Sequence, residues 1–405
     1  MSFLYFDQKV SRGELNVKIG GSLVSRWRTA DRIVWKVREI DLPGLNERLE
    51  QDVEHLRKRL ETVGPGNAKG AAEALNSYIR AANEYWQYSS LNLVSSAQCR
   101  SRLRNELLKH AQRVWAQAEV DPYAAARHAP TIQSFCRNMT SAHVPLELLP
   151  LGAPTTRNDD LWASLSQLPS FYSAWQSIFV DGATIGSIIP EGPSKPSARV
   201  MLRGVNAPNW KSMKSSLSGG GAEVLPDIPF ANTFKDNIDA ALFILSPRDL
   251  TGSGRPVSDV HVYAHGRVGE SFRDAFCIDL VYGSKVWPKG SYKVTTLDFK
   301  DAVEMLKERD HHPPSLIWLN CCHAGGKVGK ELFSQAARIS SAAASIIAPR
   351  VEVPNYFARD FAAAFYRGWT GDLTIQRTFL GAKLERACMG DPSPIFFYCL
   401  GPGVD

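Results

Sequence analysis

The sequence has no hydrophobic run long enough to form a membrane helix. A helix that spans a bilayer needs roughly 18 or more consecutive apolar residues, and no stretch of this chain reaches that length without a charge. The first residues, MSFLYFDQKVSRGEL, also lack the basic start and long apolar core of a secretion signal. These absences predict a cytoplasmic protein that does not bind membranes.

Cysteine is scarce, with 7 residues in a chain of 405, and no two of them have C-x-x-C spacing. An odd, thinly spread set does not suit the disulfide framework of a secreted protein. It also lacks the paired thiols of a four-cysteine zinc site. We therefore expect reduced thiols and no metal. The unusual feature is the adjacent pair Cys321 and Cys322.

Strong charge bias is also missing. The formal net charge is +6, and basic residues are interleaved with acidic ones, so nucleic-acid binding is not indicated. No phosphate-binding loop is present, and no organic cofactor is expected. The charges of the segment 100–113 are interpreted as the solvated face of a helix.

Residues 1–129 are expected to form a separate module. Short apolar runs near residues 4, 15 and 32 predict strands, and apolar residues at helical spacing follow in 45–63, 75–86 and 103–115. The apolar faces of these helices need a partner. The module is therefore predicted to be a mainly helical bundle that binds a regulatory protein and contributes no catalytic group.

Residues 130–405 show short apolar runs that alternate with helical patterns, which is typical of an α/β domain with a largely parallel sheet flanked by helices. Helices are expected at 329–344, 356–368 and 373–388, and a loop or loosely held helix at 211–221. Strands are expected at 144–149, 198–205, 240–246, 259–266, 275–281, 315–321, 344–349 and 394–400.

Two of these expected strands end on residues that suit nucleophilic catalysis. The strand at 259–266 ends at His265 and Gly266, and the strand at 315–321 ends just before Cys322. Parallel strands present their carboxyl ends at one sheet edge, where α/β proteins place reacting groups. A cysteine attacks as a thiolate and needs a neighbouring histidine to accept its proton. His265 is thus predicted to be the general base and acid, and Cys322 the nucleophile.

Two motifs carry a family resemblance. YAHG at 263–266 and LNCCHAGG at 319–326 resemble the His-Gly and Cys-x-[Ser/Thr/Ala]-Gly motifs of the CHAT family of clan CD cysteine peptidases, which is related to caspases, metacaspases and separase. VPLELL at 144–149 is similar to the Pro-Trp-Glu-Leu-Leu strand of that family, with Leu146 in place of Trp. The likeness covers about residues 130 to 405 and aligns the nucleophile with Cys322, 57 residues after His265.

The resemblance implies a caspase-like fold and a cysteine endopeptidase that cleaves a protein substrate. In prokaryotic relatives this often means a regulated protease of antiviral defence or programmed cell death. Backbone N–H groups of Gly266 and Cys322 are the expected oxyanion hole, and Asn320 and Arg267 are expected to line the substrate groove. Metacaspases carry, at the position of Asn320, an Asp that helps to bind a basic side chain of the substrate. A preference for Lys or Arg before the scissile bond is therefore not supported here.

Several neighbouring cysteine and histidine residues have other interpretations. Cys321 and His261 are expected to be buried structural residues. A metal site built from His311, His312 and His323 with the cysteine pair is disfavoured, because adjacent residues of an extended chain point to opposite sides.

Two alternative functions remain. One is a catalytically silent caspase-like adaptor, against which the intact His-Cys pair argues. The other is a nucleotide or nucleic-acid sensor in residues 1–130, which lacks a phosphate loop or basic cluster to support it.

Overall fold

The structure is a computed structural model that divides into two compact units. Unit 1 comprises Met1–Gly182 with Gln376–Phe396, and unit 2 comprises Ala183–Ile375 with Phe397–Asp405. The described residues are 2–27, 32–89, 94–137, 144–152, 159–180, 195–204, 209–229, 233–247, 257–267, 277–279, 293–307, 314–324 and 345–401.

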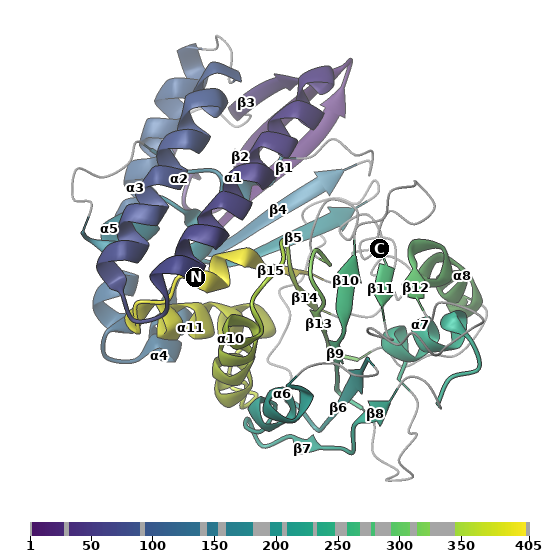
Figure 1. Cartoon of the computed structure of the whole chain (residues 1–405). Coiled ribbons are helices and arrows are strands. Elements are labelled where there is room, and N and C mark those ends of the chain that lie inside the picture. Colours follow the sequence, from purple (N-terminus) through teal and green to yellow (C-terminus); the bar gives the residue numbers. More distant parts are fainter. Residues whose placement is uncertain are drawn as a thin grey trace. The chain divides into compact units, whose positions relative to one another are not determined.

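Within unit 1, five strands pair in the order β3-β2-β1-β4-β5 (Figure 1). The pairs β1/β2 and β2/β3 are antiparallel, whereas β1/β4 and β4/β5 are parallel. Side chains of β1 and β2 alternate between buried and half-buried, as expected for strands with one face on a core. The strands are β1 (Phe3–Ser11), β2 (Glu14–Gly20), β3 (Arg32–Arg38), β4 (Thr131–Arg137) and β5 (Ala174–Val180).

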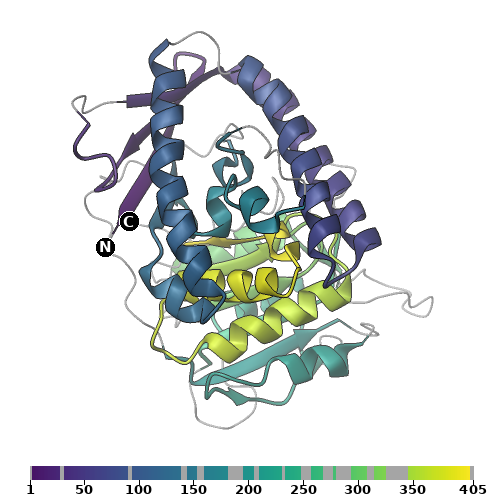
Figure 2. The same ribbon diagram turned by 90° about the vertical axis from the view of Figure 1, so that its left-hand side faces the viewer.

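The helices of residues 42–118 follow the predicted apolar spacing and are the long purple and blue helices of Figure 2. The first ends at Gly64, whose φ of 74° lies in the left-handed region and whose N–H bonds the Leu60 carbonyl. α1 packs against α2, α2 against α5, and α3 against β3. The helices are α1 (Leu42–Val63), α2 (Ala68–Ser89), α3 (Val94–Ala118), α4 (Pro122–His128), α5 (Leu161–Leu165) and α11 (Ile375–Cys388), the last in unit 1 from Gln376 on.

The compact units do not follow the expected division between residues 129 and 130. β4 begins at Thr131, just after that boundary, and pairs in parallel with β1 along its whole length. Gln8 of β1 adds to this connection, because its side-chain amide donates to Ser134 Oγ and to the Val144 carbonyl, both at 2.9 Å. α1 to α4 therefore connect β3, at the edge of this sheet, to β4, which lies beside β1. The proposed regulatory role of 1–129 stays a prediction.

Unit 2 has a mixed, mostly parallel sheet with the strand order β15-β14-β13-β9-β6-β7, in which β8 also pairs with β6. Its pairs are parallel except β14/β15. A small antiparallel sheet, β10-β11-β12, is also present. The strands are β6 (Ala198–Arg203), β7 (Glu223–Val224), β8 (Ile228–Pro229), β9 (Asp259–Tyr263), β10 (His265–Arg267), β11 (Cys277–Asp279), β12 (Lys293–Thr295), β13 (Leu316–Asn320), β14 (Ser345–Pro349) and β15 (Phe397–Leu400).

An aromatic cluster joins the sheet of unit 2 to a helix. Trp318 of β13 is fully buried, and its ring centroid lies 5.1 to 5.6 Å from those of Phe361, Phe365 and Tyr366. These three residues lie on α10, so this helix covers the sheet face to which Trp318 points. The helices of the unit are α6 (Trp210–Ser216), α7 (Asn237–Leu245), α8 (Thr296–Lys307) and α10 (Asn355–Gly368).

Two expected strands were wrong. The segment 144–149 contains a 3-10 turn at Leu146–Leu148, because Pro145 has no N–H for a strand ladder and the Val144 N–H donates to the Gln8 side chain at 2.7 Å. The segment 240–246 falls largely in helix α7, where the Asp236 side chain caps the helix by accepting from the Asp239 N–H at 2.8 Å. The expected helix at 329–344 lies outside the described residues.

Unit 2 therefore has a mixed, largely parallel sheet with flanking helices, as the sequence predicted at that level for residues 130–405, whereas the sheet of unit 1 has two parallel and two antiparallel strand pairs. The specific caspase-like fold stays a prediction. Among the described helices, none combines the length and the apolar character needed to cross a bilayer.

Candidate active site

Two neighbouring parallel strands of unit 2 carry the predicted catalytic residues to one sheet edge. β9 and β13 pair in register from Asp259 beside Leu316 to Tyr263 beside Asn320. The pairing continues past the strand ends, since the Ala264 N–H points to the Asn320 carbonyl at 3.5 Å. The segments that follow both strands, which contain His265 and Cys322, therefore leave the sheet side by side.

His265 is the first residue of β10, which is separated from the end of β9 by Ala264 alone. It is partly exposed, and its main chain lies opposite Asp279 in the antiparallel register of β10 and β11. Gly266 lies opposite Ile278 in the same ladder. The small sheet thus holds the backbone of the His-Gly motif, which a free loop would not do.

Cys322 lies in a tight turn just past β13. The Ala324 N–H donates to the Cys321 carbonyl at 3.1 Å and closes this turn. His323, the following residue, has a φ of 60°, a left-handed conformation that non-glycine residues seldom adopt. Such backbone conformations cluster at functional sites, where the surrounding structure holds them in place.

The main chain of Gly266 packs directly against that of Cys322. A Cβ built on Gly266 would overlap the Cys322 carbonyl oxygen and would lie 2.9 Å from its carbonyl carbon and 3.0 Å from its nitrogen. The φ of Gly266 is not in the left-handed region. Glycine is therefore required here because a side chain would have no room beside Cys322. This contact brings the two halves of the predicted site together, including the two residues assigned to the oxyanion hole.

The two adjacent cysteines have different surroundings. Cys321 is fully buried, with its thiol 3.9 Å from the Val262 carbonyl, and burial, reinforced by the charge of Cys322, raises the pKa of Cys321 above its usual range. Cys322 is partly exposed. Because the thiolate is the nucleophilic form, these surroundings favour Cys322 over Cys321 as a nucleophile.

His261 is a buried structural residue, as predicted. It is fully buried, its Nδ1 lies 3.0 Å from the Tyr366 hydroxyl, and its ring stacks on Trp318 at 5.8 Å. Burial, with a further contribution from the Arg199 charge, lowers the pKa of His261 to about 3. It therefore stays neutral near pH 7 and cannot cycle protons as a general base.

A buried ion pair lies at the start of β9. Arg199 Nε and Asp259 Oδ1 are 2.7 Å apart, and both side chains are fully buried. The Arg199 guanidinium also lies 3.8 Å from the ring centroid of Tyr366. Burial raises the pKa of Asp259 to about 6 despite the opposing effect of Arg199. Removal of one partner would leave an uncompensated buried charge and would therefore strongly destabilise the fold.

Two residues at the same sheet edge were not predicted from the sequence. Tyr263 is 5% exposed, and burial, followed by the charge of nearby Cys322, raises its pKa to about 12. Arg203, its neighbour in register on β6, pairs with Asp227 at 2.6 Å. Each is the last residue of its observed strand and lies within an expected strand, which is the available sequence signal for both. Their proximity to the site depends on the strand order.

The expected groove residues have contrasting positions. Asn320 is 8% exposed, and its amide nitrogen lies 3.7 Å from the Met213 sulfur on α6. This contact directs the side chain into the packing between β13 and α6. The backbone of Arg267 belongs to β10, whereas its side chain lies outside the described residues. A role of either residue in substrate binding stays a prediction.

Among the described residues, no three His, Cys, Asp or Glu side chains come close enough to hold a metal ion together. His323 belongs to the described turn, whereas His311 and His312 of the disfavoured metal site lie outside the described residues.

Comparison with known proteins assigns no family to this chain. No known family model and no curated protein sequence matches it. The chemical interpretation therefore depends on the site itself and on the resemblance of its two motifs to those of CHAT peptidases.

Proposed function

We propose that this protein is a caspase-like cysteine endopeptidase that cleaves a protein substrate with Cys322 as nucleophile and His265 as general base. The observation that carries the proposal is the contact between Gly266 and the main chain of Cys322. It joins the ends of two parallel strands and leaves a partly exposed histidine and a partly exposed cysteine at one edge.

The reaction follows from these positions. His265 removes the proton from the Cys322 thiol, and the thiolate attacks the carbonyl carbon of the scissile peptide bond. The oxyanion accepts hydrogen bonds from the backbone N–H groups of Gly266 and Cys322. The tetrahedral intermediate then expels the amine, which takes the proton held by His265. Water, activated by His265, hydrolyses the resulting thioester and restores the thiol.

The neighbouring residues support this division of roles. His261 stays unprotonated in its buried position, and the raised pKa of Cys321 keeps that thiol protonated, so neither competes for the chemistry. The resemblance to CHAT peptidases further supports a regulated cytoplasmic protease of prokaryotic antiviral defence or cell death. In that proposal the helices within residues 1–129 bind a regulatory protein, and no metal or organic cofactor takes part.

A proteolysis assay tests the proposal. The full chain is incubated with a proteome-derived peptide library, and new peptide ends are identified by mass spectrometry. The wild type should produce a consistent set of cleavages that Cys322→Ala lacks, whereas Cys136→Ala, which changes a buried cysteine of β4 in unit 1, should keep them. Identical cleavages with Cys322→Ala would refute the proposal. A wild-type chain that cleaves no peptide, even though a peptide-based electrophile modifies Cys322, would favour the adaptor function.

A further inference from the structure

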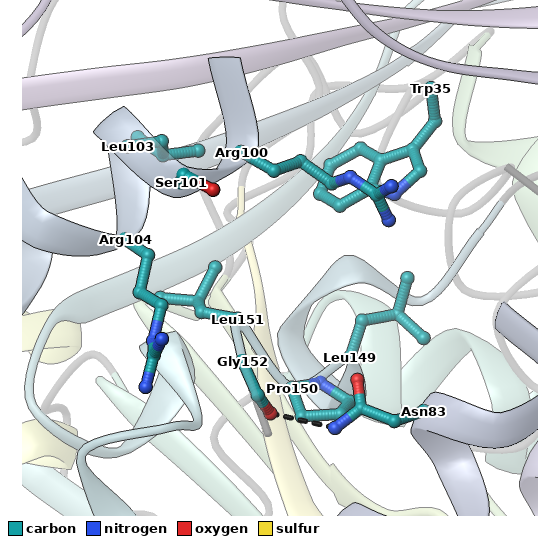
Figure 3. A pocket seen from close by; sticks show the side chains of 10 residues that line it. All are labelled: Trp35, Asn83, Arg100, Ser101, Leu103, Arg104, Leu149, Pro150, Leu151 and Gly152. Carbon is teal, nitrogen blue, oxygen red and sulfur yellow. Dashed lines mark hydrogen bonds between the residues drawn. The ribbon is translucent and has the colours of Figure 1, made fainter. Parts of the chain in front are cut away.

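Unit 1 contains a cavity of about 370 Å³ between β3, α2, α3 and the segment that ends at Gly152 (Figure 3). The two charged side chains of its lining do not converge. Arg100 lies beside Trp35, Arg104 lies against Gly152, and their guanidinium groups point apart. Both arginines are half-buried, unlike the solvated helix face that was expected for the charges of 100–113. We assign no ligand to this cavity, because its polar groups do not meet at one point.

In unit 2, polar side chains do meet in a row next to the proposed catalytic residues. Arg203 of β6, Tyr263 of β9 and Asn320 of β13 are neighbours in register across three parallel strands. Tyr263 precedes His265 by two residues, and Asn320 precedes Cys322 by two residues. This row is therefore the last one of the sheet before the two catalytic segments begin.

The three side chains of the row lie on one face of the sheet. Side chains alternate along a strand, so Tyr263 points to the same side as His261. His261 packs on that side against α10, where its Nδ1 lies 3.0 Å from the Tyr366 hydroxyl. Strands paired in register share their faces, which places Arg203 and Asn320 on this side as well. The row is thus a continuous polar strip at the carboxyl edge of the sheet.

The two outer members of the row are directed to other partners. The Arg203 side chain pairs with Asp227 at 2.6 Å. The Asn320 amide nitrogen lies 3.7 Å from the Met213 sulfur on α6. These contacts hold both side chains on the helix and loop that cover the row. Tyr263, the central member, differs from them because its protonation depends on the catalytic cysteine.

Tyr263 keeps its hydroxyl proton and responds to the charge of Cys322. Burial first, and then the negative charge of the Cys322 thiolate, raises the pKa of Tyr263 to about 12. The phenol is therefore a neutral O–H donor near pH 7. Electrostatic interaction between two groups is mutual, so the phenol acts on the thiolate as the thiolate acts on the phenol. A donor favours the charged form of its acceptor, and for cysteine that form is the nucleophile.

We propose that Tyr263 is a positioning residue of the site and that its hydroxyl stabilises the thiolate of Cys322. Tyr263 acts through the nucleophile assigned above, so this role rests on the proposed function. The residue is 5% exposed and is held between two paired strands, so its side chain loses little freedom when the hydroxyl acts as a donor. His265 accepts the thiol proton, while Tyr263 lowers the pH at which the thiol gives it up.

Several other titratable and charged groups from the neighbouring elements lie at or near this edge of the sheet. They are His265, Cys321 and His323 beside Cys322, Arg203 with Asp227 and Lys214 beside Tyr263, Arg350 and Glu352 after β14, and Arg359 and Asp360 on α10. A change confined to the Tyr263 hydroxyl leaves all of these groups in place. A shift in the pH dependence of Cys322 therefore reports that hydroxyl.

Alkylation of Cys322 by iodoacetamide tests this role in the full chain. Cys388→Ala is the background, because Cys388 is exposed and would react as well. The rate is followed by mass spectrometry across pH, and its midpoint gives the apparent pKa of Cys322. Tyr263→Phe should raise this midpoint by about one pH unit, since a hydrogen bond to a charged group contributes roughly that much. Alkylation near pH 7 should then be about tenfold slower, and the difference should vanish at high pH.

Tyr366→Phe is the matched control, because it removes the hydroxyl of another buried tyrosine on the same side of the sheet. It should leave the midpoint of Cys322 unchanged, and thermal melts establish that each variant is folded. Tyr263→3-fluorotyrosine keeps the ring and makes the hydroxyl a stronger donor. It should lower the midpoint, and it decides the question if Tyr263→Phe does not fold.

The role of Tyr263 is overturned if these Tyr263 variants keep the wild-type midpoint, or if Tyr366→Phe shifts the midpoint as much as Tyr263→Phe. Because alkylation does not require proteolysis, the two proposals can fail separately. A wild type that cleaves peptides, with no shift in Tyr263→Phe, would contradict the role of Tyr263 alone. A wild type that cleaves nothing, with the expected shift in Tyr263→Phe, would contradict the protease alone.

Discussion

Replacement of Gly266 by alanine should disable the site without removing any catalytic group. The new Cβ would overlap the Cys322 carbonyl oxygen and lie 2.9 Å from its carbonyl carbon, whereas carbon atoms normally approach to about 3.5–4.0 Å. The two backbones must therefore separate by roughly 1 Å. A misplacement of that size can reduce a catalysed rate by about 100-fold, while overpacking lowers the free energy of unfolding by about 1–3 kcal/mol.

The assay is the rate at which a peptide-based electrophile modifies Cys322, measured by mass spectrometry beside a thermal melt. Gly44→Ala is the matched control, because a Cβ at Gly44 meets no atom within 4 Å. Gly266→Ala should react at least about tenfold more slowly while it remains folded at the assay temperature, and Gly44→Ala should behave as the wild type. A Gly266→Ala protein that reacts at the wild-type rate would refute the role assigned to this contact.

Three further predictions concern the neighbouring residues. Cys322→Ala should abolish proteolysis, whereas Cys321→Ala should keep most of it and lose about 1 kcal/mol of unfolding free energy, as a small buried side chain does; reversed phenotypes in cleavage assays and urea melts would contradict this assignment. His265→Ala should eliminate activity with little change in melting temperature, because a partly exposed residue contributes little to packing, and an active variant would exclude the dyad. His261→Asn should alter the pH dependence of stability: the folded-state pKa of about 3 lies below the unfolded value of about 6.5, so His261 stabilises the fold above pH 6.5 and this contribution is lost as pH falls toward 3. In urea melts from pH 7 to pH 4, the unfolding free energy of the wild type should therefore fall more steeply than that of the variant. The difference between the two slopes should reach up to about 1.4 kcal/mol per pH unit. Asp259, with its raised pKa, acts in the opposite direction in both proteins, so an unchanged difference between them across this range would argue against a neutral, buried His261.

The elements with regular apolar spacing were predictable. The alternation in β1 and β2 and the helical period of α1 fix which side chains are buried, and the structure has these elements where the patterns indicate them. β4 was missed, because its buried residues include Gln133 and Ser134, and polar side chains of that kind mask a strand pattern. The helix α7 was taken for a strand, since a short apolar run fits either structure.

For the site, the sequence supports the placement of His265 and Cys322 at one sheet edge, because both follow expected parallel strands. It does not contain the pairing of β10 with β11 or the closeness of Tyr263 to Cys322, which depend on strand order and on the path of the chain after each strand. The cavity of unit 1 was also beyond prediction, because Trp35 and Arg100 lie far apart in the sequence and meet through the packing of α3 on β3.

The assignment of His265 and Cys322 as the catalytic pair is tested by mapping the adduct of a peptide-based electrophile on the intact chain. Cys388→Ala serves as the starting background, because Cys388 is exposed and would otherwise be modified as well. We expect one adduct on Cys322, no adduct in Cys322→Ala, and a rate of modification at least about 100-fold lower in His265→Ala. An adduct on Cys321, or equal modification of Cys322 with and without His265, would contradict it.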